Sequence, residues 1–101
     1  IVRPTGIASF LFYDREGQGI EPHIDTDVFA INVIIMLEHK RPKTHGSALV
    51  LFPPHKDPQR VELADGEMIV IFAGSVAHGR EPIKRDETVS ILTIGFQPTD
   101  A

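Results

Sequence analysis

The chain has 101 residues, of which 42% are apolar, a length and composition that fit one globular domain with a packed core. A net charge of −4 excludes the strongly basic surface that nucleic acids or anionic membranes select, and the longest apolar stretch, 29–37, is too short to cross a bilayer. Cysteine is absent, which excludes disulfides and thiol chemistry, and we expect a reducing, cytoplasmic location. The chain begins at Ile1 without a methionine, and we expect it to be part of a longer protein.

Six segments, taken in chain order, have the alternation or the β-branched composition typical of strands. They are residues 6–14, 28–37, 47–52, 60–63, 67–73 and 88–96. Turns rich in glycine, proline or aspartate separate most of them, and no segment has the period of an amphipathic helix. The sequence therefore predicts an all-β fold, as a sandwich, barrel or jelly roll.

Between the first two predicted strands lies "EPHIDTD", in which His23 and Asp25 stand two positions apart. In an extended chain such residues point to the same side, so an imidazole and a carboxylate would be presented together. A third ligand has to come from elsewhere, and His78 is the candidate because it follows the strand 67–73 and a glycine-containing bend. The basic stretch 38–46 is predicted to be a solvated loop, and no nucleic-acid partner is expected from it.

Two histidines and one carboxylate on one side of a metal leave the opposite positions open, as in non-haem Fe(II) oxygenases. Catalytic zinc sites use a similar set, so these ligands alone do not fix the metal. The motif H-x-D also arises by chance, and Asp25 and Asp27 could simply form a turn. The order of strands, turns and histidines along the chain favours a metal site.

With its elements in this order, the sequence resembles the 2-oxoglutarate- and Fe(II)-dependent oxygenases, in the group that includes prolyl 4-hydroxylase-like enzymes. The resemblance runs from about Phe10 to Phe96 and is carried by "FYDREGQGIEPHIDTD", "HGSALVLF", "LADGEMIVIFAGSVAHGREPI" and "ETVSILTIGF". It implies one domain over 1–101 with a double-stranded β-helix, a cupin-like jelly roll. It implies Fe(II) bound by His23, Asp25 and His78 as the catalytic centre, and 2-oxoglutarate as co-substrate.

The resemblance also implies an activity. Such an enzyme uses dioxygen to hydroxylate an unactivated C–H bond of a small-molecule or peptide substrate and releases succinate and carbon dioxide. No membrane partner is expected. Family members usually carry helices before the barrel, and these are not visible in this sequence. We therefore expect a partner, or a segment outside residues 1–101, to cover one sheet face.

The resemblance aligns the family's Arg-x-Ser pair with Thr88 and Ser90, so threonine replaces the arginine that grips the far carboxylate of 2-oxoglutarate. A buried carboxylate needs a charged partner, and a guanidinium can bind it through two hydrogen bonds. Arg80 is the favoured replacement, because it follows His78 by two residues and would face the same side of a strand. The alternatives are basic residues of the next loop, Lys84 and Arg85.

Other residues are candidates for the cavity. Tyr13 matches a family tyrosine whose hydroxyl can bond the co-substrate carboxylate. Asn32 interrupts an apolar strand and must either line the cavity or tie down a loop. Met36 and Phe12 are expected in the core rather than at the substrate.

Two other functions fit the same fold. One is a cupin-type metal enzyme that does not use 2-oxoglutarate, although cupins typically present H-x-H with a later glutamate. The other is a non-catalytic jelly-roll module whose metal site is structural or vestigial.

Overall fold

The computed structural model describes residues 1–43 and 45–99, and within these ranges the chain is built from strands without an α-helix. The strands are β1 (Val2–Tyr13), β2 (Ile20–His23), β3 (Ile31–Lys40), β4 (Leu49–Phe52), β5 (Gln59–Val61), β6 (Met68–Ile71), β7 (Ala77–Arg80) and β8 (Thr88–Pro98), and a 3-10 helix, η1 (Asp27–Phe29), precedes β3. Over the described ranges, no helix has the length and apolar character that a membrane span requires.

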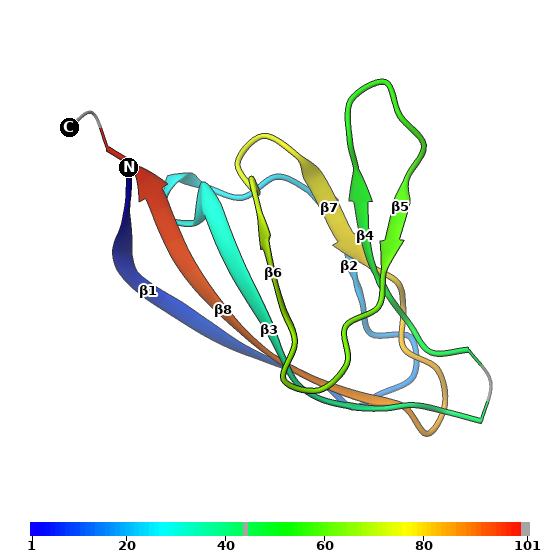
Figure 1. Ribbon diagram of the computed structural model, residues 1–101. Coiled ribbons are helices and arrows are strands. Elements are labelled where there is room, and N and C mark those ends of the chain that lie inside the picture. Colours follow the sequence, from blue (N-terminus) through cyan, green and yellow to red (C-terminus); the bar gives the residue numbers. More distant parts are fainter. Residues whose placement is uncertain (44, 100–101) are drawn as a thin grey trace.

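The strands form two antiparallel sheets that face each other (Figure 1). The long-strand sheet has the order β1-β8-β3-β6, and the short-strand sheet has the order β2-β7-β4-β5. Alternate side chains of both sheets meet between them, which is where a two-layer β fold buries its core. The core consists of Tyr13, Ile34, Met36, Leu49, Ile71, Ala73, Ile83, Val89 and Ile91. The predicted all-β jelly roll is confirmed.

All six predicted strands are present, with shifted ends. The first begins earlier, at Val2, and the predicted strand 28–37 begins only at Ile31 because Asp27–Phe29 form the 3-10 helix. Strands β2 and β7 were not predicted. Each of these has only four residues and contains a proline or a glycine, so neither shows a readable alternation.

A β-bulge in β3 changes which side chains face the interior. The pairing of β3 with β8 shifts register between Met36 and Glu38, so Leu37 is an extra residue in the strand. Up to Met36 the even-numbered side chains point inward, and beyond the bulge His39 does so instead. The predicted solvated loop 38–46 is therefore wrong at its start, where the chain continues β3 and buries a histidine.

The outer face of the long-strand sheet is apolar and exposed. Its large side chains are 44–64% exposed and come from β1, β3, β6 and the residue after β6. They are Phe10, Phe12, Leu37, Met68, Val70 and Phe72. The prediction that Phe12 lies in the core is wrong, because its neighbours Leu11 and Tyr13 take the inward positions of β1. Met36 is buried as predicted.

Candidate metal centre and its cavity

Three side chains with metal-ligating atoms converge on one side of the short-strand sheet. His23 ends β2 and pairs directly with His78 on the neighbouring antiparallel strand β7, and Asp25 follows His23 by two residues. Asp25 Oδ1 lies 3.1 Å from His23 Nε2 and 3.3 Å from His78 Nε2. Ligand atoms of all three residues lie within 4.8 Å of one another. The structure thus brings together the trio that the sequence singled out.

Hydrogen bonds fix the orientation of each of the three. The Nδ1 atoms of His23 and His78 each donate to the backbone carbonyl two residues earlier, at 2.8 and 2.9 Å. Because a carbonyl only accepts, Nδ1 carries the hydrogen and Nε2 is left to face the other ligands. The Asn32 side chain donates to Asp25 Oδ2 at 3.1 Å, which holds the carboxylate. Supporting bonds of this kind are typical of metal ligands.

The donor set fits a divalent cation. With neutral imidazoles, two nitrogen lone pairs and a carboxylate oxygen meet, and all three are acceptors. These lone pairs repel one another, and the arrangement is stable only if protons or a cation lie between the three atoms. Two histidines and one carboxylate suit Fe(II) when other coordination positions stay open, and a catalytic zinc would also accept them. His23 is the exposed member of the trio, with 40% of its side chain accessible, so the site is open to solvent on that side.

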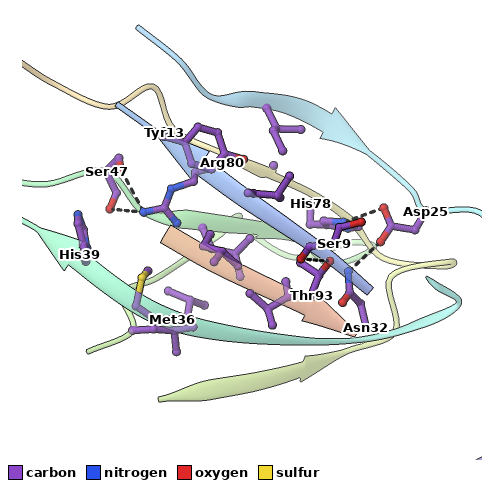
Figure 2. A pocket seen from close by; sticks show the side chains of 18 of the residues that line it. Ser9, Tyr13, Asp25, Asn32, Met36, His39, Ser47, His78, Arg80 and Thr93 are labelled. Atoms are coloured by element: carbon purple, nitrogen blue, oxygen red, sulfur yellow. Dashed lines mark hydrogen bonds and ion pairs between the residues drawn. The ribbon is translucent and has the colours of Figure 1, made fainter. Parts of the chain in front are cut away.

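The trio lines a cavity between the two sheets (Figure 2). The wall is mostly apolar, with Leu11, Ile34, Leu49 and Ile91 among the side chains that form it. Asn32 also lines it, so this amide both faces the cavity and ties down the loop that carries Asp25. An apolar cavity with a few converging polar groups is the usual form of a small-molecule site.

Arg80 lies in the same cavity, two residues after His78 and on the same side of β7. It is only 7% exposed, and its Nη2 donates to Ser47 Oγ at 3.1 Å. Its guanidinium carbon lies 6.0 Å from the centre of the Tyr13 ring. Burial lowers the pKa of Arg80, and the Tyr13 and Glu87 oxygens oppose this effect. Burial raises the pKa of Tyr13, against the effect of the Arg80 charge.

Thr88 and Ser90 lie elsewhere. Both are on β8, but the inward positions of this part of the strand belong to Val89 and Ile91, and neither Thr88 nor Ser90 lines the cavity. Ser90 pairs with Phe12 on the outer face of the long-strand sheet. Successive residues of a strand point to opposite faces, which keeps both side chains away from the metal ligands. The structure does not bring these two residues into the candidate site.

The two basic alternatives to Arg80 are also outside the cavity. Lys84 and Arg85 are exposed in the loop between β7 and β8, and neither side chain lines the cavity wall. Of the cations considered from the sequence, Arg80 is the one that the structure places in the same cavity as His23, Asp25 and His78.

A buried polar network next to Arg80 was missed by the sequence reasoning. Glu87 is 2% exposed and accepts hydrogen bonds from His39 Nε2 at 2.6 Å and from Ser47 N and Oγ at 2.7 and 2.9 Å. Its other oxygen accepts from the Lys84 backbone N–H at 2.8 Å. Burial raises the pKa of Glu87, but these hydrogen bonds outweigh it and hold the pKa at about 2. The sequence placed His39 in a solvated loop and Ser47 at the start of a strand, and it assigned no role to Glu87, because charged and polar side chains are usually exposed.

No protein-family model matches the sequence, and no curated protein matches it either. Among solved structures, the chain is similar to the crystal structure of a Pseudomonas putida prolyl-4-hydroxylase, with a TM-score of 0.75 and 22% sequence identity. The match covers 91% of this chain and 51% of that chain, so this chain spans about half the length of that structure. The chain therefore shares its jelly-roll fold with a prolyl-4-hydroxylase, and a His-Asp-His cluster lines its inner cavity.

Proposed function

We propose that this protein is an Fe(II)- and 2-oxoglutarate-dependent dioxygenase that hydroxylates a C–H bond of a small-molecule or peptide substrate. The observation that carries the proposal is the convergence of His23, Asp25 and His78 in a cavity that also contains the buried cation Arg80. Bound Fe(II) would couple decarboxylation of 2-oxoglutarate by dioxygen to hydroxylation of the substrate, giving succinate and carbon dioxide.

Each part of the chain has a task in this reaction. His23, His78 and Asp25 hold the metal from one side and leave positions open for ligands. Arg80 and Tyr13 bind the far carboxylate of 2-oxoglutarate. Residues two apart on a strand are separated by roughly 7 Å, which is about the length of a five-carbon diacid. One 2-oxoglutarate molecule can therefore reach from a metal at His78 to Arg80. The apolar walls exclude water, which strengthens these polar contacts.

The test is an anaerobic titration of Fe(II) and then 2-oxoglutarate, followed through the weak visible charge-transfer band of the ternary complex. We expect the band in the wild type, its loss in His78→Ala, and its retention in His45→Ala, which removes an exposed histidine far from the cluster in sequence. Iron binding without a band at any 2-oxoglutarate concentration would contradict the proposal.

One observation favours a second candidate. Glu87 brings a buried negative charge close to Arg80 and so lowers the net positive charge available to a second carboxylate. A metal enzyme that does not use 2-oxoglutarate would retain the metal cluster and need no such charge. In the titration, such an enzyme would bind iron without forming the ternary band. A non-catalytic module would show only a change in stability when it binds metal.

A further inference from the structure

Among the described residues, three buried side-chain atoms have no hydrogen-bond partner: Asn32 Oδ1, His39 Nδ1 and Arg80 Nε. All three residues line the same cavity. Nearly all buried polar atoms in folded proteins are hydrogen-bonded, and the exceptions need a reason. A ligand that enters this cavity would supply the missing partners. The Asn32 side chain already donates a hydrogen bond to Asp25. His39 and Arg80 lie towards the other end of the cavity, near Ser47 and apart from Asp25 (Figure 2). There His39 bonds to Glu87, and Arg80 bonds to Ser47.

The bond to Glu87 determines which nitrogen of His39 is available. Glu87 is ionised, because its hydrogen bonds hold its pKa at about 2, and a carboxylate only accepts. His39 Nε2 lies 2.6 Å from Glu87 Oε2 and therefore carries a hydrogen. The atom left over is Nδ1, which belongs to a side chain only 2% exposed.

The backbone keeps this pair in place. The β-bulge at Leu37 turns His39 inward, and the backbone N–H of His39 donates to Asp65 Oδ1 at 2.8 Å. Gly46 passes so close to the pair that a Cβ there would lie 3.1 Å from Glu87 Oε2 and 3.2 Å from the His39 ring. A larger residue at position 46 would press on the His39–Glu87 pair, whose side chains would have to shift by a few tenths of an ångström. The pair is therefore built into the fold.

With His39 neutral, the two buried charges at this end of the cavity balance before a ligand binds, because Arg80 is positive and Glu87 is negative. A ligand carboxylate adds one negative charge to a buried site, which is costly unless a further positive charge appears. Protonation of His39 would supply that charge and turn Nδ1 into a second donor in the same cavity as Arg80 Nε.

We propose that His39 and Arg80 together bind the far carboxylate of a dicarboxylate co-substrate, and that His39 takes up one proton as this carboxylate binds. The inference rests on the proposed function, and it assigns a role to His39 and Glu87 that the metal site does not require. Because a proton is bound with the ligand, affinity falls as the pH rises. The charged and titratable groups at this end of the cavity are Glu87 before β8, Arg80 on β7, Tyr13 on β1, Glu62 beside β5 and Asp65 in the turn before β6. Arg41 after β3 and Glu81 after β7 also act on the charge of Arg80.

The first test uses the wild type, with Zn(II) as a diamagnetic substitute for Fe(II). The 15N chemical shifts of the His39 ring nitrogens are measured with and without 2-oxoglutarate. We expect one protonated nitrogen before binding and two afterwards. An unchanged His39 spectrum in the presence of bound 2-oxoglutarate would overturn the inference.

The second test separates the far carboxylate from the metal-binding end of the ligand. 2-Oxovalerate has the same carbon chain as 2-oxoglutarate but a methyl group in place of the far carboxylate. In anaerobic Fe(II) titrations, we expect His39→Gln to weaken 2-oxoglutarate roughly tenfold to a hundredfold and to leave 2-oxovalerate unchanged. We also expect the pH dependence of 2-oxoglutarate affinity to disappear in this variant. His45→Gln, at an exposed position, is the matched control.

Loss of the buried pair can also harm folding, so the double variant His39→Gln/Glu87→Gln, which keeps a neutral hydrogen-bonded pair, is measured as well. If neither variant folds, the wild-type spectra and the wild-type pH dependence of the two ligands decide the question. Binding of both oxo acids with equal pH dependence would overturn this inference and leave the proposed function standing. Failure of the wild type to form any complex with 2-oxoglutarate would overturn both.

Discussion

His23 and His78 are direct partners across the antiparallel ladder between β2 and β7, although 55 residues separate them in the sequence. Strand β2 is the edge of its sheet and has only four residues. His78, the cross-strand partner of His23, lies on β7, an inner strand that also pairs with β4. A metal bound by both imidazoles would tie the edge strand to the interior of the sheet.

We therefore expect metal binding to stabilise the fold. At a free metal concentration a hundred times the dissociation constant, the gain in unfolding free energy is about 2.7 kcal/mol. For a domain of this size such a gain raises the melting temperature by roughly 10–20 °C. Thermal unfolding with and without Mn(II), a stable substitute for Fe(II), measures it. His23→Ala should abolish the shift, and His55→Ala, at an exposed position, should keep it. Equal shifts in both variants would place the metal elsewhere.

Arg80→Leu should remove most of the affinity for 2-oxoglutarate and leave Fe(II) affinity unchanged. The guanidinium is buried, and loss of a buried charged hydrogen-bond partner costs about 2–5 kcal/mol, so the dissociation constant should rise at least about thirtyfold. Arg80→Lys should recover part of the loss, because it restores the charge without the fork. Arg85→Leu, in the exposed loop, is the control. A loss of Fe(II) affinity in Arg80→Leu would mean that the substitution disturbs β7 as a whole.

Asn32→Leu should weaken metal binding by roughly 10–100-fold, the usual effect of removing a hydrogen bond to a metal ligand. The amide donates to Asp25 Oδ2, so the variant frees the carboxylate to rotate. Isothermal titration with Mn(II) measures the change. Thr93→Val is the matched control, because it alters another polar wall residue, whose hydroxyl donates to the Ser9 carbonyl rather than to a ligand. Equal losses in the two variants would argue for general damage to the cavity.

Glu87 should make folding sensitive to acid. Its pKa in the folded chain is about 2, against an ordinary 4.5, so its ionised form favours the folded state. The contribution is fully present above pH 4.5 and is lost as the pH falls towards 2. Its size is about 3 kcal/mol. Urea unfolding of the wild type and of Glu87→Gln should show a stability difference that shrinks over this range. A difference that stays constant with pH would contradict the assignment.

The outer face of the long-strand sheet should make residues 1–101 self-associate. Met68 and Phe72 are 61% and 64% exposed on the edge formed by β6 and the residue after it, and a large exposed apolar surface invites contact with another molecule. We propose, as the sequence suggested, that a partner or another segment covers this face. Met68→Lys/Phe72→Lys should reduce the apparent mass at high concentration in light scattering, with little change in melting temperature. Unaltered association would direct attention to another surface.

The long strands could be predicted from the sequence, and so could the convergence of His23, Asp25 and His78. Strand β8 has eleven residues, and inward and outward positions alternate along most of it. The three side chains were singled out by the spacing of His23 and Asp25 and by the place of His78 after a strand and a bend. Short strands gave no such signal, since β2 and β7 have too few residues for a period. The side of Arg80 could be predicted because it needed only the two-residue spacing from His78.

The remaining features depend on backbone register, which the sequence does not display. The sequence does not show that Val89, and not its neighbours Thr88 and Ser90, faces the interior. A shift of one residue in strand register moves a side chain to the opposite face of the sheet. His39 was hidden by the bulge, because a regular strand would have turned it outward. Glu87 is charged, and only the folded chain shows the four hydrogen bonds that make its burial tolerable.

The bulge at Leu37 has a consequence for how this cavity can change. If Leu37 were deleted, Glu38 would follow Met36 directly and the strand would alternate regularly, with Glu38 still outward opposite Ser90 and His39 still inward opposite Val89. The deletion would remove the bulge without changing which residues line the interior. A regular strand that kept Leu37 would instead turn Glu38 inward and His39 outward, and so place a second carboxylate beside Glu87. The chain can therefore lose one codon at this exposed position and keep the wall of its cavity.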